Sequence, residues 1–524
     1  MRITNHMIYG NALNNVFRNA RHINNMVVQI ETSKRIQRPS DDPLLSARTM
    51  RYRTILAENE RFQVNAHSAL AWMEVTESAF GNLVNGRDSL LWEMNDLLVR
   101  AAQTGSNDID DHRAMIETLR QQFYQIGQIE MNQTIEGRYV FSGFHTDQPP
   151  VLVLNQPDAT FRITQSFSRS DIVPTVAMQR FANTELPIMH DDTHILLLPY
   201  RDGIDYGTLS TAAPPAGTVA TNISIAGFTV HARGLNNPYA YLPEPGFVHF
   251  IPETGELVFN QADLPNIPPS GIDVQYIRTG FNAGELNPVV YFESQQLAGS
   301  PPPLGTPTVT LTEDVRIPVA SGGFAAGAIV PAGTPMPWDT IIGDYNVENQ
   351  RVHFEFSNNL YVHINSFAKE VFTPQMFADL KRLIEFVDAL DPSNPEIIRA
   401  HFINEGYTGD ELDREVDAFM AGEKSRFAHL VHDRFNIMME RHSMHKSAIQ
   451  TQHTNLGTRM ARLDMLVHRL EEDNIHYTAL LSDAEDVDTS GTILRLNAAR
   501  NAFNDSLRAT GIITQLSLAN SINR

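Results

Sequence analysis

Three groups of side chains have types and spacings that could support chemistry. The run His190-Asp191-Asp192-Thr193-His194 holds two imidazoles and two carboxylates, which are ligands for divalent metals. Further along, His429 and His432, and again His442 and His445, form i, i+3 pairs on one predicted helix, where they share a face and could bind zinc. The adjacent acids Asp41 and Asp42 could act as a general acid and base.

Each group also has a structural interpretation, which we favour. The run from His190 to His194 lies beside proline in irregular sequence and is expected to be a solvated loop. The paired histidines are expected to form a polar helix face. Asp41 and Asp42 lie between Pro39 and Pro43, where a carboxylate caps a helix. The sequence has no glycine-rich phosphate loop, no His-Glu-x-x-His and no nucleophile elbow. We therefore predict no catalytic, cofactor-binding or metal-binding residues, and no enzyme activity.

Proline distribution divides the chain into helical ends and a β-rich middle. Residues 1–140 contain only Pro39 and Pro43, residues 141–370 contain twenty-four prolines, and no proline follows Pro395. Proline removes a backbone donor and disrupts helix interiors. The ends can therefore form long helices, whereas the middle must consist mainly of strands and turns.

Heptad spacing predicts the helices of the N-terminal end. Residues at alternating spacings of four and three form a seam in the first helix: Tyr9, Leu13, Val16, Ala20, Ile23, Val27 and Ile30. This helix is expected to end near Arg38, because Pro39 disfavours helical geometry at the preceding residue. Ser40 or Asp41 can cap the next helix, with Pro43 in its first turn. If that helix runs from 44 to 104, it is about 90 Å long; a third helical segment follows over 109–126.

The C-terminal end repeats the pattern. The seam runs through Leu456, Met460, Leu463, Val467, Leu470, Asn474, Tyr477 and Leu481, in a helix expected to begin near Glu423. After a break at 488–491, an amphipathic helix is expected over 492–523. The sequence thus predicts an α+β protein, in which a long antiparallel α-helical coiled-coil rod is built from both termini and carries an inserted β-rich central region.

Alternating residues predict β-hairpins in the middle. One hairpin pairs 351–356 with 360–364 around Asn358-Asn359, and another pairs 247–251 with 256–259. The sequence Gly299-Ser300-Pro301-Pro302-Pro303 is interpreted as a hinge, and the helical period returns over 367–390. The expected regions are an N-terminal export and assembly helix that is disordered in the monomer (1–40), the N-terminal half of the rod (41–144), a β-rich domain (145–300), a second β subdomain (301–365), a helical connection and appendage (366–422), the C-terminal half of the rod (423–491) and a C-terminal assembly helix (492–524).

Composition narrows the class of protein. The 524 residues include 42% hydrophobic and 19% charged residues, enough for ordinary cores, and the net charge of −21 disfavours binding to nucleic acid or an acidic membrane surface. Residues 1–50 hold seven Lys or Arg against three Asp or Glu, whereas residues 141–370 hold nine against twenty-two. No apolar run is long enough to span a membrane, and no secretory signal is visible at the start. Cysteine is absent, which excludes disulfides and suits a protein exported without oxidative folding.

The first and last stretches carry more apolar residues than two paired helices can bury. Residues 1–35 and 492–524 are amphipathic and lie at opposite chain ends. A pair of helices is too thin to cover all these positions, so a third element or neighbouring subunits must cover them. We predict that assembly and the turn between the first two helices depend on Ile3, Leu13, Val16, Ile23, Val27, Pro39, Asp41, Pro43, Leu496, Phe503, Leu507, Ile513 and Leu516.

Two distant motifs resemble the flagellin superfamily. The stretch from Thr32 to Pro43, TSKRIQRPSDDP, is similar to the superfamily's Thr-Gly-Lys-Arg-Ile…Pro-Ser-Asp-Asp-Pro turn, with Ser33 in place of the usual glycine. Near the other end, Leu456-Gly457, Arg462-Leu463-Asp464 and the acidic run 482–488 resemble the C-terminal rod signature. The opening Met1-Arg2-Ile3-Thr4 and the motif GRYVFSGF at 137–144 resemble the hook–filament junction proteins of this superfamily. Pro149-Pro150 departs from the Pro-Phe usual after that motif, and the middle is larger than the family usually carries.

The resemblance implies a structural function in the bacterial flagellum. It implies export through the flagellar type III apparatus, escort of the C-terminal helix by a chaperone, and extracellular assembly through the terminal helices at the junction of hook and filament. The implied partners are other copies of the chain, the first junction protein, flagellin and the export chaperone, with no nucleic acid, membrane or cofactor. Two alternatives stay open: a flagellin-type filament subunit, and a flagellin-like protein that displays a binding or adhesin domain.

Overall fold

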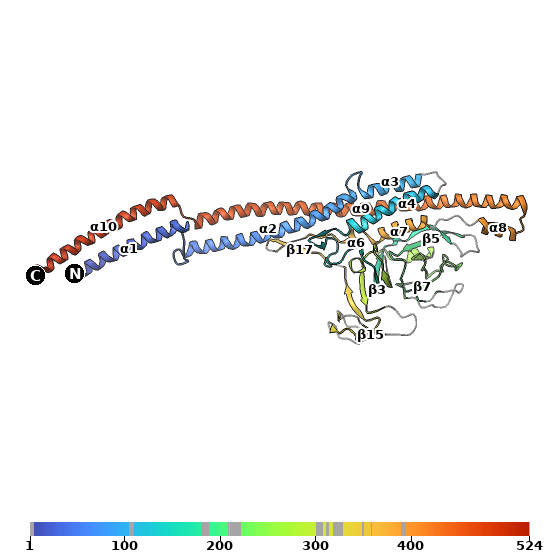
Figure 1. Ribbon diagram of the computed structural model, residues 1–524, viewed down its shortest axis with the longest axis horizontal. Helices are drawn as coiled ribbons and strands as arrows, with labels where there is room; N and C mark the ends of the chain where they lie inside the picture. Colours follow the sequence, from blue (N-terminus) through green and yellow to red (C-terminus); the bar gives the residue numbers. More distant parts are fainter. Residues whose placement is uncertain are drawn as a thin grey trace. The chain divides into compact units, whose positions relative to one another are not determined.

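The chain forms two compact units, which are described separately. The computed structural model describes residues 5–103, 109–179, 188–207, 209, 222–299, 308–310, 314–317, 329–347, 350–357, 359–388 and 395–522 (Figure 1). The first unit contains the described parts of Met1–Ser68, Phe354–Val362 and Arg462–Arg524. The second contains those of Ala69–His353 and His363–Ala461. The predicted hinge beyond Gly299 lies outside the described residues.

Long helices occupy the two ends of the chain, and shorter ones lie between them. The α-helices are α1 (Asn5–Thr32), α2 (Pro43–Val84), α3 (Leu90–Gln103), α4 (Ile109–Tyr124), α5 (Pro288–Tyr291), α6 (Ala368–Val371), α7 (Pro374–Asp388), α8 (Pro395–Asn404), α9 (Gly409–Glu485) and α10 (Thr489–Ile522). A π-helical turn follows α4 at Gln125–Glu130, and 3-10 turns lie at Arg169–Asp171 and Gln261–Asn266. Among the described helices, none is both long and apolar enough to cross a membrane.

Two five-stranded sheets form most of the β-rich middle. The first has the order β16 (Ile341–Tyr345), β11 (Glu293–Leu297), β3 (Gln156–Phe167), β10 (Ile272–Phe281) and β6 (Ser224–Ile225). The second has the order β4 (Val173–Gln179), β5 (Ile188–Leu197), β9 (Glu256–Phe259), β8 (Phe247–Ile251) and β7 (Thr229–Ala232), in which only β7 and β8 pair in parallel. Because β16 pairs with β11, the first sheet contains strands from both sides of the boundary expected at residue 300.

Four two-stranded sheets complete the described β structure. They pair β1 (Thr134–Ile135) with β2 (Arg138–Tyr139), β12 (Thr308–Thr310) with β15 (Pro335–Pro337), β13 (Val315–Arg316) with β14 (Ile329–Val330), and β17 (His353–Ser357) with β18 (Leu360–His363). The two hairpins predicted from alternation, β8–β9 and β17–β18, are both confirmed. At the second of them, Asn359 has a positive φ of 67°, as its turn position requires. The predicted α+β architecture is confirmed as well.

In the first unit, α2 runs antiparallel to α9. Asn59 and Gln63 both donate from their side-chain amides to the carbonyl oxygen of Leu470, at 2.8 and 3.0 Å, and the ring of Tyr52 lies 6.4 Å from that of Tyr477. Residue numbers therefore rise along one helix as they fall along the other. The heptad seam of the C-terminal rod is confirmed here, since its apolar positions Leu463, Val467 and Leu470 are buried.

In the second unit, the other halves of these helices pack with α3, α4 and α7. The ring of Phe80 stacks on His453 at 5.5 Å and meets Phe141 edge-on at 6.2 Å. The predicted continuous helix from 44 to 104 is wrong: α2 ends at Val84 and α3 begins at Leu90. Gly86 between them has a φ of 85°, which a right-handed helix excludes. Arg87, which would place a charge on the seam of a continuous helix, lies instead in this turn.

The motif at residues 137–144 is a structural turn beside this core. Glu136 and Gly137 join β1 to β2 with positive φ angles of 51° and 78°, as a two-residue hairpin turn requires. Gly143 has a φ of 62°, and a Cβ there would lie 2.4 Å from the side-chain oxygen of Gln350. Phe141 is fully buried. The motif's glycines and aromatic ring therefore have conformational and packing reasons to be there.

Three further predicted helix limits are wrong. The first helix ends at Thr32 and not near Arg38, because Ser33 adopts a left-handed φ of 56° that ends the helix before the proline does. The long C-terminal helix begins at Gly409 and not near Glu423, so it takes in part of the predicted appendage. A break before the last helix is present, but it lies at residues 486–488 and not at 488–491, so the last helix begins at Thr489 and not near residue 492.

Candidate functional site

The terminal helices pair with each other in the first unit. α1 and α10 lie side by side and antiparallel, with the N and C termini at the same end of the pair (Figure 1). Most of the predicted assembly residues whose side chains are described are partly buried: Leu13, Val16, Ile23, Val27, Leu496 and Phe503. Leu507 is 45% exposed. Ile3 lies outside the described residues, and Ile513 and Leu516 lie on α10 in a part whose side chains are not described.

The pair leaves large apolar side chains exposed. Met7 and Phe17 of α1 are 56% and 57% exposed, and Leu494 and Ile512 of α10 are 72% and 59% exposed. Sequence reasoning did not select these four residues, because it followed the heptad seam, whereas these lie off it. It also missed Met26, the most buried described side chain of α1. The two helices therefore leave part of their own apolar surface exposed.

A short backbone ladder joins the turn after α1 to the turn before α10. The Arg35 N–H donates to the carbonyl oxygen of Glu485 at 2.7 Å, and the Val487 N–H donates to that of Ser33 at 3.0 Å. Lys34 and Asp486 form an isolated antiparallel bridge between these two bonds. We call residues 33–35 and 485–487 the terminal clasp. It fixes the register between the two ends of the chain.

Charged side chains reinforce the terminal clasp. Lys34 Nζ lies 2.7 Å from Asp486 Oδ1 and 3.2 Å from Glu485 Oε1, and Arg53 Nε donates to Glu485 Oε2 at 3.2 Å. Burial alone would raise the pKa of Glu485, but the hydrogen bonds from Arg53 and Lys34 outweigh burial and lower it. The hydrogen bond to Asp486 raises the pKa of Lys34, and that from Lys34 lowers the pKa of Asp486. All three groups are therefore held in their charged forms.

The proline turn between α1 and α2 uses its acids differently from the prediction. Asp42 caps α2, since its Oδ1 accepts from the Leu45 N–H at 3.0 Å, and Pro43 is the first helical residue. Asp41 instead closes the preceding turn, where its Oδ2 accepts from the Arg38 N–H at 2.9 Å. The capping assignment to Ser40 or Asp41 is therefore wrong. The interpretation of this acid pair as part of a helix-starting turn is confirmed.

The histidine groups are structural, though not in the way predicted. His190 and His194 lie on strand β5 and not in a solvated loop; both are buried, and His190 Nε2 is 2.8 Å from Gln179 Oε1. Burial lowers the pKa of His190. The partner strand β4 creates this environment, which the local sequence did not reveal.

Of the two predicted histidine pairs of α9, His429 and His432 lie at exposed positions, whereas His442 and His445 do not. His442 is fully buried with Nε2 at 2.8 Å from the carbonyl oxygen of Leu91, and His432 Nδ1 lies 2.7 Å from that of Ala102. His445 Nε2 is 2.9 Å from Asp379 Oδ2. Of these four histidines, His429 and His432 are exposed, as predicted, whereas His442 is buried and His445 is half-buried. Within the described ranges, no three His, Asp or Glu side chains gather as metal ligands.

Comparison with known protein families gives a match for the N-terminal part of the chain. Residues 3–146 match the family model of the bacterial flagellin N-terminal helical region, which confirms the resemblance to the flagellin superfamily there. The fold is similar to that of FlgL from Xanthomonas campestris, at 12% identity and a TM-score of 0.31, covering 82% of this chain and 99% of that one. It is also similar to the flagellar junction protein FlgL from Legionella pneumophila, at 15% identity and a TM-score of 0.29, covering 84% of this chain and 100% of that one. Comparison with curated proteins gives no match.

Proposed function

We propose that this chain is a structural subunit of the bacterial flagellum that forms the junction between hook and filament. The flagellin match over residues 3–146 supports the flagellar part of the proposal. The motifs at residues 1–4 and 137–144 favour the junction. The main support for a role in assembly is the α1–α10 pair, which leaves Phe17 and Leu494 exposed. The function is structural, and we assign no catalytic residue.

Assembly proceeds through the terminal helices. The exposed side chains of α1 and α10 pack against neighbouring copies of the chain, the first junction protein and flagellin, and burial of a large apolar side chain contributes about 1.5–3 kcal/mol. The predicted assembly positions on these helices, from Ile3 to Leu516, act at or behind that surface. α1 and α10 become fully ordered only in this packing. Before it, the chain leaves the cell through the flagellar type III system without a cleaved signal, and a chaperone covers the C-terminal helix.

A double substitution tests the assembly surface. Phe17→Ser with Leu494→Ser removes two exposed apolar side chains without opening a cavity. In a strain that lacks the gene, we expect the variant to reach the medium while hooks stay bare and flagellin is shed. The matched control, Asn14→Ser with Asn497→Ser, changes exposed polar positions on the same helices and should restore filaments and motility. Normal filaments on cells that carry the double serine variant would refute the proposed surface.

The position of the protein in the flagellum separates the alternatives. Immunogold labelling should place a junction protein in a narrow band where hook meets filament. Label along the whole filament would instead show a flagellin-type subunit. Filaments that stay attached when the gene is removed would favour a displayed binding protein, because such a protein is not needed for attachment.

A further inference from the structure

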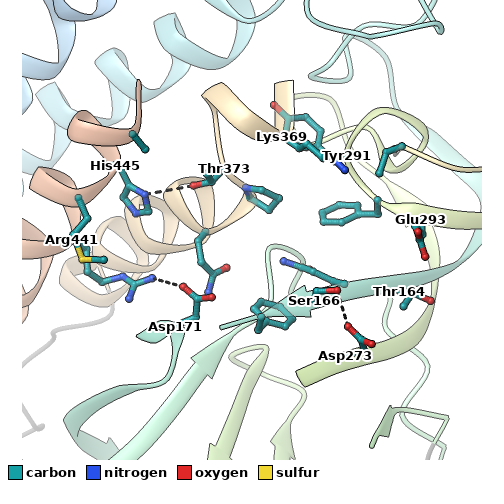
Figure 2. Close-up of a pocket in the computed structure, with 18 residues that line it drawn as sticks. Thr164, Ser166, Asp171, Asp273, Tyr291, Glu293, Lys369, Thr373, Arg441 and His445 are labelled. Atoms are coloured by element: carbon teal, nitrogen blue, oxygen red, sulfur yellow. Dashed lines mark hydrogen bonds and ion pairs between the residues drawn. The ribbon is translucent and has the colours of Figure 1, made fainter. Parts of the chain in front are cut away.

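The second unit contains a cavity of about 710 Å³ that the assembly role does not use. The end of β3 and the starts of β10 and β11 form one wall, and α7 and α9 form the other (Figure 2). Apolar side chains, among them Phe167, Phe292 and Met444, make up part of the lining. This volume lies within the range of about 300–1,000 Å³ that small-molecule sites occupy.

The charged side chains of the lining are mostly paired with one another. Arg441 bonds to Asp379 and lies 3.8 Å from Asp171, and His445 Nε2 is 2.9 Å from Asp379. Across the cavity, the Ser166 hydroxyl donates to Asp273 at 2.6 Å (Figure 2). The other two charged residues in the lining, Lys369 and Glu293, have opposite signs. The lining thus holds three carboxylates, Asp171, Asp273 and Glu293, against two basic side chains, Arg441 and Lys369. This balance disfavours an anionic ligand and leaves carboxylate oxygens that can accept hydrogen bonds from hydroxyl groups.

Two buried amides in the wall have unsatisfied hydrogen-bonding groups. Gln165 and Gln375 line the cavity, and each is only 7% exposed. In the part of the chain that the structure describes, Gln165 Oε1 and both amide atoms of Gln375 have no hydrogen-bond partner. Buried polar groups almost always have partners, so these three atoms call for a ligand that both donates and accepts. A hydroxyl group does both.

We propose that this cavity binds a neutral carbohydrate of one or two sugar units. Its hydroxyls pair with the amides of Gln165 and Gln375, which turn into the cavity to meet them, and with the hydroxyls of Thr164 and Thr373 on opposite walls. The apolar side chains contact the faces of the sugar rings. The proposal does not depend on the junction function, since the cavity lies wholly within the second unit.

Saturation-transfer NMR on the full chain tests the proposal. The probes are glucose, N-acetylglucosamine, maltose and cellobiose at millimolar concentration, and we expect transfer to at least one of them. The double variant Gln165→Met and Gln375→Met keeps side-chain volume but removes the amides, so the affinity should fall at least tenfold. Its melting temperature should stay the same or rise, because unpaired polar atoms are removed from the interior. Gln148→Met, outside the cavity, should bind as the parent does.

Three results would overturn the proposal. The first is no transfer to any of the four sugars. The second is unchanged affinity in the double methionine variant, and the third is a matching loss in the Gln148→Met control. Transfer to the neutral tripeptide trialanine with none to the sugars would point to a peptide site instead and would equally refute a carbohydrate site.

Discussion

The terminal clasp allows the contribution of one buried carboxylate to be measured locally. Glu485→Gln keeps the shape of the side chain but removes its charge from Lys34 and Arg53. A hydrogen bond to a charged group contributes about 1.5–3 kcal/mol. Because the side chains of Lys34 and Arg53 are 41% and 61% exposed and regain water, we expect about 2 kcal/mol for both contacts together.

Hydrogen exchange can report this loss without a global unfolding measurement. The amides of Arg35 and Val487 donate across the clasp, so their exchange measures its opening. At neutral pH, a loss of about 2 kcal/mol corresponds to exchange about 30-fold faster in the Glu485→Gln variant. The control Glu472→Gln, at an exposed position of α9, should leave both amides unchanged.

The pH dependence supplies a second check. The pKa of Glu485 is lowered in the folded chain from its ordinary value of 4.5. The contribution of Glu485 to the stability of the clasp is therefore complete above pH 4.5 and is lost as the pH falls through the lowered folded-state pKa. Below this folded-state pKa, the exchange rates of parent and variant should converge. A difference below threefold at neutral pH, or one that is undiminished in acid, would refute this account of the clasp.

Three further predictions concern single residues. Ser33→Gly should relieve the strain of the left-handed φ of 56°, which is about 1 kcal/mol, and should slow exchange of the Val487 amide about fivefold. Faster exchange would contradict this prediction. Asp42→Ala should cost about 1 kcal/mol in the first turn of α2, measured by exchange of its amides, whereas Ser40→Ala should have no effect; equal effects would contradict the capping assignment. Burial lowers the pKa of His442 from 6.5 to about 4, so the free energy of unfolding should fall as the pH drops from 6.5 towards 4. Thermal melts of the parent and of His442→Gln measure this pH dependence, and their slopes should differ by about 1 kcal/mol per pH unit. A smaller difference would contradict the prediction.

The sequence predicted the large features because they depend on local periodicity. Heptads and proline distribution separate the helical ends from the β-rich middle, and the β8–β9 hairpin follows from alternation around Thr254 and Gly255. The errors occur where contacts between residues far apart in the sequence determine the local structure. α1 ends at Thr32, before Ser33 whose carbonyl oxygen accepts from the Val487 N–H, and His194 is buried because β4 pairs with β5.

The assembly surface was predicted only in part. The seam residues were identifiable from the heptad, but Phe17 and Leu494 lie off the seam, and only the helix pairing shows that they stay uncovered. The cavity gave no signal in the sequence, because Gln165 and Gln375 lie more than two hundred residues apart. Only the packing of sheet against helices brings them to the same cavity.

The terminal clasp also sets the order in which the molecule can fold. Lys34 and Asp486 are separated by 452 positions, so the clasp closes one of the longest loops in the chain. Contacts of such separation form late, because the entropy of closing the loop must be overcome before the contact stabilises anything. The strands of the second unit pair over shorter separations, such as the 137 positions from Thr160 to Leu297, so its sheets can form first. A chain interrupted before residue 486 would thus acquire its sheets and yet present no paired terminal helices to a neighbour.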